Sequence, residues 1–278
     1  MMTIKYVNSN GKSVNLNRSH YKMLVSDILD YEWEYVTNGD RIIGFKKSIK
    51  EKTLSIDILA SSQKTARQWE KELFEIFEVD VINGIPGKLY INDWYLPCFI
   101  FKSTKTGWET DRLIMDEVKL VCDQVLWIYE DKVEISELTE DEEDNEGKIY
   151  PYQYSFRYDK SVAVEKISSK HYAESDFRLV AYGPTAEVSV KIAGHTYKVS
   201  HVVEDGDYMV IDSRKSQPLG EQIYIVKANG ETENVFNDRD TNGEIFKRIP
   251  PGNVSVSYNR EYAIELTVFR ERSEPEWS

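Results

Sequence analysis

The chain has 278 residues, of which 48 are acidic and 35 basic, so its formal net charge is −13. This length is enough for one large domain or two ordinary ones, each with a hydrophobic core. The acidic excess, with no stripe of Lys and Arg, argues against a nucleic-acid-specific site and against binding to membranes, and no apolar run approaches the ~18 residues of a membrane span.

The first 60 residues are predicted to form β-hairpins. Asn10–Gly11 and Asn38–Gly39 each lie between two runs of apolar and aromatic residues. Asn-Gly is the preferred pair of a tight hairpin turn, because both central positions of the turn need a positive φ. The segment TLSIDIL alternates, which predicts that one face of a strand carries Leu54, Ile56 and Ile58.

Residues 61–79 carry the one clear helix pattern of the chain. Their large apolar side chains recur at i, i+4, i+7 and i+8: Trp69, Leu73, Ile76 and Phe77. This spacing places them on one helix face, and Ser61 or Ser62 can cap the start. We expect the face to pack on the protein's own sheet; a groove for a partner is the alternative.

Residues 80–130 return to strands, with turns expected at the Gly-Ile-Pro-Gly segment, at Asn92–Asp93 and at Thr106–Gly107. The two cysteines, Cys98 and Cys122, are too few for a disulfide framework. They are predicted to be ordinary buried thiols, which would touch if they lie on neighbouring strands.

Residues 137–146, ELTEDEEDNE, are mostly acidic and have almost nothing to bury. Such a run repels itself and is expected to be a solvated loop or linker. A calcium site is the alternative, but the EF-hand spacing with its glycine is absent.

Residues 150–278 are predicted to be all β. Three segments alternate so that apolar side chains share a face: Phe177, Leu179 and Ala181; Val188, Val190 and Ile192; Tyr262, Ile264, Leu266 and Val268. Turns are expected at Ala193–Gly194, at Asn229–Gly230 and at the Pro-Pro-Gly segment. Short strands with turns every ~8–12 residues are typical of a β-sandwich.

Residues suited to catalysis or metal binding are few. The four histidines are His20, His171, His195 and His201. Only His195 and His201 are close enough in sequence to meet, and no third ligand is evident, so no metal site is predicted. Glu204, Asp205 and Asp207 fit a polar turn. No nucleophile elbow, phosphate-binding loop or dinucleotide-binding motif occurs, so we expect neither an enzyme nor a cofactor.

Several segments in fixed order resemble one known family. They are GKLYINDWYLPCFI at residues 87–100, VKLVCDQVLWIY at 118–129, FRLVAYGPTAEVSVKIAGHTYKV at 177–199, YMVIDS at 208–213, NVFNDRD at 234–240, RIPPGNVSVSY at 248–258 and ERSEPEWS at 271–278. Their order and spacing over nearly the whole chain resemble the distal tail proteins (Dit) of long-tailed bacteriophages.

The resemblance implies a mainly β protein of two domains. Residues 1–136 would form a tail-tube-like β-sandwich or barrel with one α-helix, which builds a ring. Residues 137–149 would be an acidic linker or loop, and residues 150–278 a galectin-like β-sandwich. In some relatives the last strand returns to the first domain, which residues 271–278 would do here.

The function implied by the resemblance is that of a structural virion protein of a phage or prophage. Such proteins form a hexameric ring at the tail tip, within the baseplate. The ring joins the tail tube protein to the tail-tip hub protein, surrounds the end of the tape measure protein, and often carries receptor-binding proteins. The implied location is the virion tail tip, with the host cytoplasm as the place of assembly.

A closed ring needs two different complementary patches on each subunit. Trp94 and Trp108 stand beside expected turns and are the candidate contacts between subunits or with a partner, because Trp is enriched at interface hot spots. Packing on their own sheet is an equal alternative. An acidic channel wall would repel DNA phosphates during passage.

The galectin-like half raises an alternative function, a carbohydrate-binding module that contacts the host cell wall. Galectins use His, Asn and Arg on neighbouring strands together with a Trp. No H-x-N-x-R pattern is present here, and Trp277 is the only Trp of this half. We therefore expect a structural domain. A glycan hydrolase ranks last, because nothing singles out a catalytic pair among 48 acids.

Overall fold

A computed structural model describes residues 2–110, 112–136, 163–215, 220–259 and 261–276. The fold is mainly β with one α-helix, as the sequence predicts. The chain divides into two compact units: Met1–Tyr129 with Glu271–Ser278, and Glu130–Arg270. None of the described helices is long and apolar enough to cross a membrane.

The division between the units falls inside two strands and not at a loop. The first unit ends at Tyr129, before the predicted boundary at residue 136, and residues 271–278 belong to it. The acidic run at 137–146 and the rest of the predicted linker, 137–149, lie outside the described residues. The descriptions of the two parts as tail-tube-like and galectin-like stay predictions.

Among its described residues the first unit contains the helix and ten strands, the last of which continues into the second unit. They are β1 (Ile4–Val7), β2 (Ser13–Asn15), β3 (Tyr21–Ser26), β4 (Glu34–Asn38), β5 (Arg41–Lys46), β6 (Lys50–Leu59), α1 (Gln63–Asn83), β7 (Gly87–Ile91), β8 (Trp94–Thr110), β9 (Leu113–Cys122) and β10 (Trp127–Ile135). The strands pair with antiparallel neighbours in two series, β2-β1-β7-β8 and β8-β9-β6-β3. The 17-residue strand β8 joins the two orders, because its first part pairs with β7 and its later part with β9.

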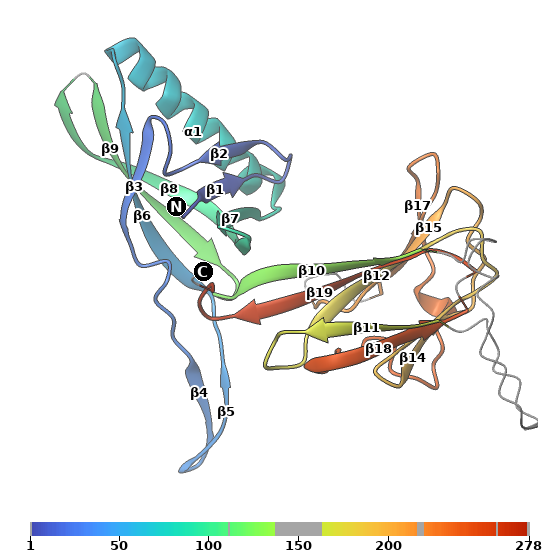
Figure 1. The fold of residues 1–278 in the computed structure, drawn as a ribbon. Helices are drawn as coiled ribbons and strands as arrows, with labels where there is room; N and C mark the ends of the chain where they lie inside the picture. Colours follow the sequence, from blue (N-terminus) through green and yellow to red (C-terminus); the bar gives the residue numbers. More distant parts are fainter. Residues whose placement is uncertain (1, 111, 137–162, 216–219, 260, 277–278) are drawn as a thin grey trace, which may run out of the picture. The chain divides into compact units, whose positions relative to one another are not determined.

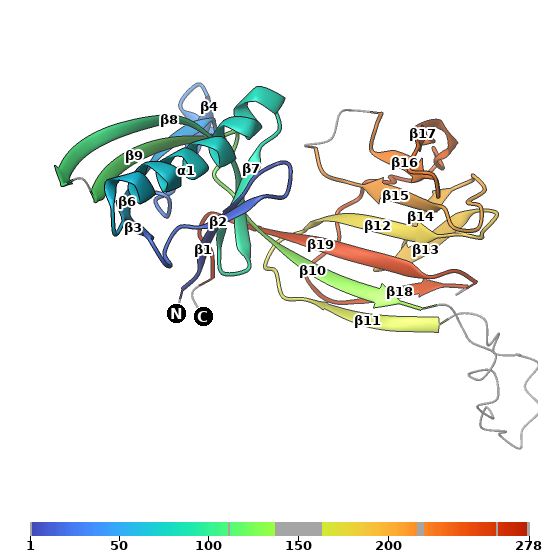
Figure 2. The same cartoon turned by 90° about the horizontal axis from the view of Figure 1, so that it is seen from above.

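Helix α1 lies against β8 and β6 and closes the core of the first unit (Figures 1 and 2). Its start is capped by Ser62, whose hydroxyl accepts from the N–H of Thr65, and it ends at Gly84 in the left-handed region, with φ 65°. Leu73, Ile76 and Phe77 are buried, so this helix face packs on the protein's own sheet. The helix extends beyond the predicted end at residue 79.

The turns predicted from Asn-Gly and Asn-Asp are confirmed. Asn10–Gly11 joins β1 to β2, Asn38–Gly39 lies where β4 turns into β5, and Asn92–Asp93 joins β7 to β8. The expected turn at Thr106–Gly107 is wrong. β8 continues through these residues to Thr110, and its pairing with β9 shifts register on both sides of Gly107, so this glycine marks an irregularity within the strand.

The second unit is a sandwich of two antiparallel sheets. Its elements are β11 (Ala163–Ser169), β12 (Asp176–Tyr182), β13 (Val188–Ile192), β14 (His195–Val199), β15 (Tyr208–Asp212), β16 (Ile223–Val226), β17 (Thr232–Asn234), the 3-10 turn η2 (Phe236–Asp238), β18 (Gly252–Tyr258) and β19 (Ile264–Arg272). One sheet has the order β17-β16-β15-β12-β19-β10 and the other β11-β18-β13-β14. The residues predicted to share inward faces on β12, on β13 and at 262–268 are buried between the sheets, which confirms the alternation.

Candidate interaction surfaces

The histidines singled out by the sequence take part in hydrogen bonds within the second unit. His195 begins β14 after the Ala193–Gly194 turn, and its Nε2 lies 2.8 Å from the carbonyl oxygen of Glu244. His201 Nδ1 lies 2.7 Å from a carboxylate oxygen of Asp238. The two rings therefore have different partners. In the described ranges, no group of three or more His, Cys, Asp or Glu is placed to hold a metal ion.

Cys98 and Cys122 lie on the neighbouring strands β8 and β9, and both are free and buried. A hydrogen bond between the two thiols, together with burial, raises the pKa of Cys98 well above its ordinary value. The Cys98 thiol therefore stays protonated inside the core, and the two cysteines are buried thiols in contact, as predicted.

Trp94 lies in the core of the first unit, with 4% of its surface exposed. Its ring lies 5.5 Å from that of Tyr129, and the guanidinium of Arg272 lies 5.8 Å from it. Trp108 lies in β8, and its side chain is outside the described part. Trp94 thus packs on its own sheet, and a contact of either Trp with a neighbour stays a prediction.

An exposed apolar surface lies on the hairpin of β4 and β5, which forms a two-stranded sheet of its own. Figure 1 shows this hairpin extending from the strands of the first unit. Four of its large apolar side chains are 60–66% exposed: Tyr35, Ile42, Ile43 and Phe45. None of them belongs to the buried core. We call this surface the apolar hairpin.

The two faces of the apolar hairpin differ. Tyr35 pairs directly with Phe45 across the strands, and Ile43 lies two residues before Phe45, so these three share one face. The register shifts between Val36 and Thr37, so that Thr37 pairs with Ile42 and Asn38 with Arg41; Ile42 therefore joins the face of Tyr35, and Arg41 lies on the other face. This face therefore combines two aromatic rings and two branched apolar side chains, all of them exposed.

The base of the hairpin is held by polar contacts. Lys47 Nζ donates to the carbonyl oxygen of Val125 at 2.7 Å and lies 4.8 Å from the ring of Trp33. Burial lowers the pKa of this lysine. Lys50 forms ion pairs with Glu32 at 3.1 Å and with Glu34 at 3.5 Å. These contacts hold the base of the hairpin in place, while the apolar side chains nearer its tip are exposed to solvent.

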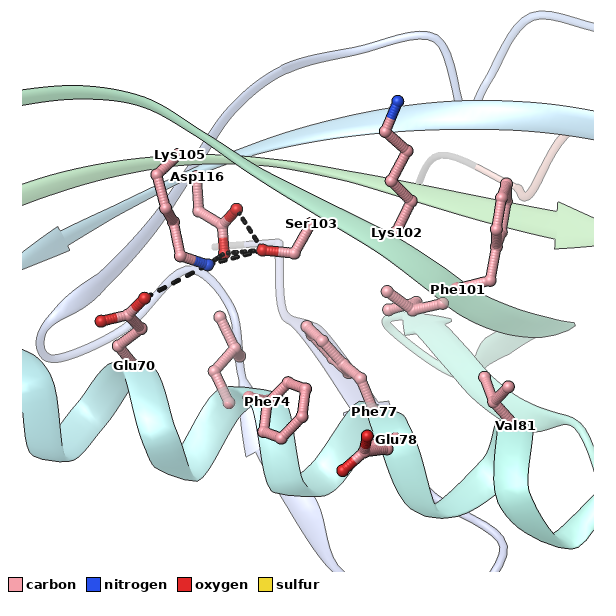
Figure 3. A pocket seen from close by; sticks show the side chains of 12 residues that line it. Glu70, Phe74, Phe77, Glu78, Val81, Phe101, Lys102, Ser103, Lys105 and Asp116 are labelled. Carbon is pink, nitrogen blue, oxygen red and sulfur yellow. Dashed lines mark hydrogen bonds and ion pairs between the residues drawn. The ribbon is translucent and has the colours of Figure 1, made fainter.

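A second surface lies between α1 and β8, where a cavity of about 170 Å³ opens (Figure 3). Phe74 and Val81 reach it from the helix and Phe101 from the strand, and they are 52%, 46% and 44% exposed. Glu70 and Glu78 stand along the helix side of the cavity. We call this surface the α1–β8 groove.

One end of the α1–β8 groove is a fixed polar cluster. The carboxylate of Asp116 is buried and accepts from Ser103 Oγ at 2.7 Å and from Lys105 Nζ at 2.8 Å. Lys105 also forms an ion pair with Glu70 at 3.4 Å. Figure 3 shows these side chains joined at one end, with Phe101 and Val81 toward the other. The carboxylate of Glu78 has no ion pair among the described residues, so it is available to a cation from outside.

Sequence reasoning missed both surfaces, although it found the elements that carry them. The helix prediction used the stripe that faces the sheet and passed over Phe74 and Val81, which lie seven residues apart beside that stripe. The hairpin prediction rested on Asn38–Gly39. The useful signal was in RIIGF, because a two-stranded ribbon has no second layer to cover its three large apolar side chains, Ile42, Ile43 and Phe45.

Comparison with known proteins places the fold. No family model matches the chain, and no curated protein matches it. Among solved structures, a chain of the phage P2 baseplate in its activated conformation with Ca is similar, with TM-score 0.66 and 14% identity over 99% of this chain and 100% of that one. A chain of the same baseplate with Sr is also similar, with TM-score 0.65 and 13% identity over 99% of this chain and 100% of that one.

The Dit protein (gp 19.1) of phage SPP1, described as a hub adsorption apparatus of phages that infect Gram-positive hosts, is also similar. Its TM-score is 0.55 and its identity 10%, over 98% of this chain and 99% of that one. The chain therefore shares a fold, along its whole length, with phage baseplate and Dit proteins. This agrees with the resemblance found in the sequence motifs.

Proposed function

We propose that this protein is a structural component of a phage tail, an adaptor that forms a ring of six copies at the tail tip. The observation that carries the proposal is the likeness of fold to baseplate and Dit proteins, which covers at least 98% of the chain in each comparison. A likeness of fold along the whole chain, and not along one part of it, is what a protein in the same role would have.

The ring would join the tail tube to the tail-tip hub and surround the end of the tape measure protein, and receptor-binding proteins would dock on it. It would assemble in the host cytoplasm and end in the virion. This role is non-enzymatic. It is supported by the apolar hairpin, because exposed apolar surface of this kind marks protein–protein contacts.

Electron microscopy of the purified full chain tests the proposal, both alone and mixed with isolated phage tail tubes. We expect rings with sixfold end views and rings attached to one end of the tubes. Particles without a central opening, which leave tube ends bare, would contradict the adaptor role. A glycan array probed with the same full chain tests the carbohydrate-binding alternative, for which we expect no bound glycan.

A further inference from the structure

The two cysteines of the chain occupy opposite positions on neighbouring strands. β8 and β9 are antiparallel, and Phe99 pairs with Val121. Continuing that register by one residue on each strand places Cys98 opposite Cys122. Residues that face one another across antiparallel strands have Cα atoms about 4.5 or 5.5 Å apart. Both separations fall within the range of about 4.4–6.8 Å that a disulfide spans.

The two side chains also point the same way. Opposed residues of antiparallel strands project to one face of the sheet, and both thiols are buried in the core of the first unit. They are in contact through the hydrogen bond that helps to raise the pKa of Cys98. The two sulfur atoms can therefore be joined by rotation of the side chains, with the strands in their present register.

Cys98 is the residue at which β8 changes partners. It pairs with Gly87 of β7, and the pairing of β8 with β9 begins beside it at Phe99. Cys122 is the last residue of β9. A covalent bond between the two cysteines would tie the end of β9 to the point where the two series of strands meet. Such a cross-link stabilises a fold mainly by restricting the unfolded chain.

A buried polar contact closes the core beside the cysteine pair. The Tyr6 hydroxyl donates to Asp80 of α1 at 2.6 Å and lies 3.4 Å from the carbonyl oxygen of Cys98. Burial, together with the nearby Cys98 and Cys122, raises the pKa of this hydroxyl. An oxidant therefore reaches the thiols, and a thiolate forms, only when this part of the fold opens.

We propose that Cys98 and Cys122 form a disulfide across β8 and β9 when the protein meets a low-molecular-weight disulfide such as oxidised glutathione, at a rate set by opening of the Tyr6–Asp80 contact. The thiolate of one cysteine attacks a sulfur of the oxidant and releases one molecule of reduced glutathione. The second cysteine attacks the resulting mixed disulfide and releases the other molecule. The cysteine pair loses two electrons, and its two protons leave with the released glutathione.

The occasion for this step rests on the proposed function, whereas the pairing of the two thiols does not. Glutathione and thioredoxin keep cytoplasmic thiols reduced, so the chain would assemble with both thiols free. A released virion leaves that compartment, and disulfides form and persist outside it. The bond would then strengthen the first unit in the finished particle without a change of fold.

Alkylation of the unfolded chain counts its free thiols. The purified full chain is kept with an excess of oxidised glutathione, unfolded in urea with iodoacetamide, and weighed by mass spectrometry. We expect an alkyl group on both cysteines before oxidation, on neither after it, and on both again once dithiothreitol has reduced the oxidised chain. Two free thiols after prolonged oxidation, a glutathione left on the chain, or a covalent dimer would each overturn the proposal.

The urea midpoint tests whether the bond fits the native ladder. The oxidised chain should unfold at a higher urea concentration than the reduced chain. The matched control is the double variant Cys98→Ala, Cys122→Ala, whose midpoint the same two treatments should leave unchanged. A midpoint of the unmodified chain that falls or stays constant on oxidation would overturn the proposal as stated.

The rate of oxidation tests how the thiols become accessible. Tyr6→Phe removes the donor to Asp80 and should speed the loss of free thiols by roughly tenfold or more, because opening becomes easier. Tyr35→Phe, on the exposed hairpin, should leave the rate unchanged. Equal rates for the two variants would overturn the control of access by the Tyr6–Asp80 contact. None of these results depends on ring formation, so the failure of this inference and the failure of the adaptor role are told apart.

Discussion

Tyr6 and Asp80 form a buried polar contact that fixes α1 to β1. The Tyr6 hydroxyl donates to Asp80 Oδ2 at 2.6 Å, and the N–H of Ser9 donates to Asp80 Oδ1 at 2.6 Å. Both side chains have 0% of their surface exposed. Burial raises the pKa of the Tyr6 hydroxyl far above its ordinary value, so the hydroxyl keeps its proton and donates a hydrogen bond to the carboxylate.

Tyr6→Phe is predicted to lower the free energy of unfolding by about 3 kcal/mol, because the buried carboxylate loses a hydrogen-bond donor. Urea denaturation measures the change. The control is Tyr35→Phe, since Tyr35 is 66% exposed on the hairpin and its substitution should change stability by less than about 0.5 kcal/mol. If the two substitutions changed the free energy of unfolding by the same amount, the contact between Tyr6 and Asp80 would not be a stabilising one.

His20 makes stability depend on pH. Its ring stacks on Trp69 with centroids 3.6 Å apart, and burial lowers its pKa below the ordinary value, opposed in part by Glu72. The unfolded chain therefore takes up this proton more readily than the folded one. The contribution of the neutral His20 ring to the free energy of unfolding is fully present above the ordinary pKa of about 6.5. It is lost as the pH falls toward the lowered pKa of His20 in the folded protein.

His20→Gln is predicted to reduce the loss of stability between pH 7.5 and pH 5.5, because Gln does not titrate. The measurement is the urea midpoint of both proteins at the two pH values. His201→Gln is the matched control: this ring is paired with Asp238 on the surface. The prediction is wrong if acidification lowers the midpoint of His20→Gln as much as that of the unmodified chain.

At the scale of elements, β7 begins where there is no room for a side chain. A Cβ on Gly87 would overlap the Tyr6 hydroxyl and the Asp80 carboxylate. Gly87→Ala should therefore destabilise the protein by about 2 kcal/mol or more, by the mechanism of overpacking. Thermal unfolding checks this, with Gly44→Ala as control, because a Cβ at Gly44 meets nothing within 4 Å. An unchanged melting temperature for Gly87→Ala would contradict the packing described.

Local sequence signals predicted those features of the fold that depend on residues close to one another in the chain. The alternation of Leu54, Ile56 and Ile58, the N-cap of α1 and the Asn-Gly turns follow from period, capping and φ preference, which act over a few residues. Gly107 misled the prediction of a turn, because a glycine serves a strand irregularity as readily as a turn and only the pairing with β9 decides between them.

The candidate surfaces were harder to predict, for a physical reason. A periodic pattern tells which side chains share a face, but not which face the rest of the molecule covers. The sequence analysis assigned Phe74 and Val81 to no helix face, and Ile43 and Phe45 to no face of a strand. Their exposure follows from the tertiary arrangement, in which β4 and β5 pair only with one another.

At the scale of the whole molecule, each unit has its own hydrophobic core, and the chain passes between the units within β10 and β19. The sequence motifs in fixed order predicted two domains. The acidic run that begins at residue 137 was the reason for ending the first predicted domain at residue 136. β10 and β19 continue past the division between the two compact units, because a hydrogen-bonded ladder does not have to end where a core ends.

The central claim is that copies of this chain associate into a closed ring, and the mass of the full chain in solution tests it most directly. Light scattering over a range of protein concentrations should show the 32.4 kDa chain converting to a species of six times that mass, with no larger species beyond it. A mass that stays at 32.4 kDa, or one that grows without limit as concentration rises, would contradict a closed ring of six.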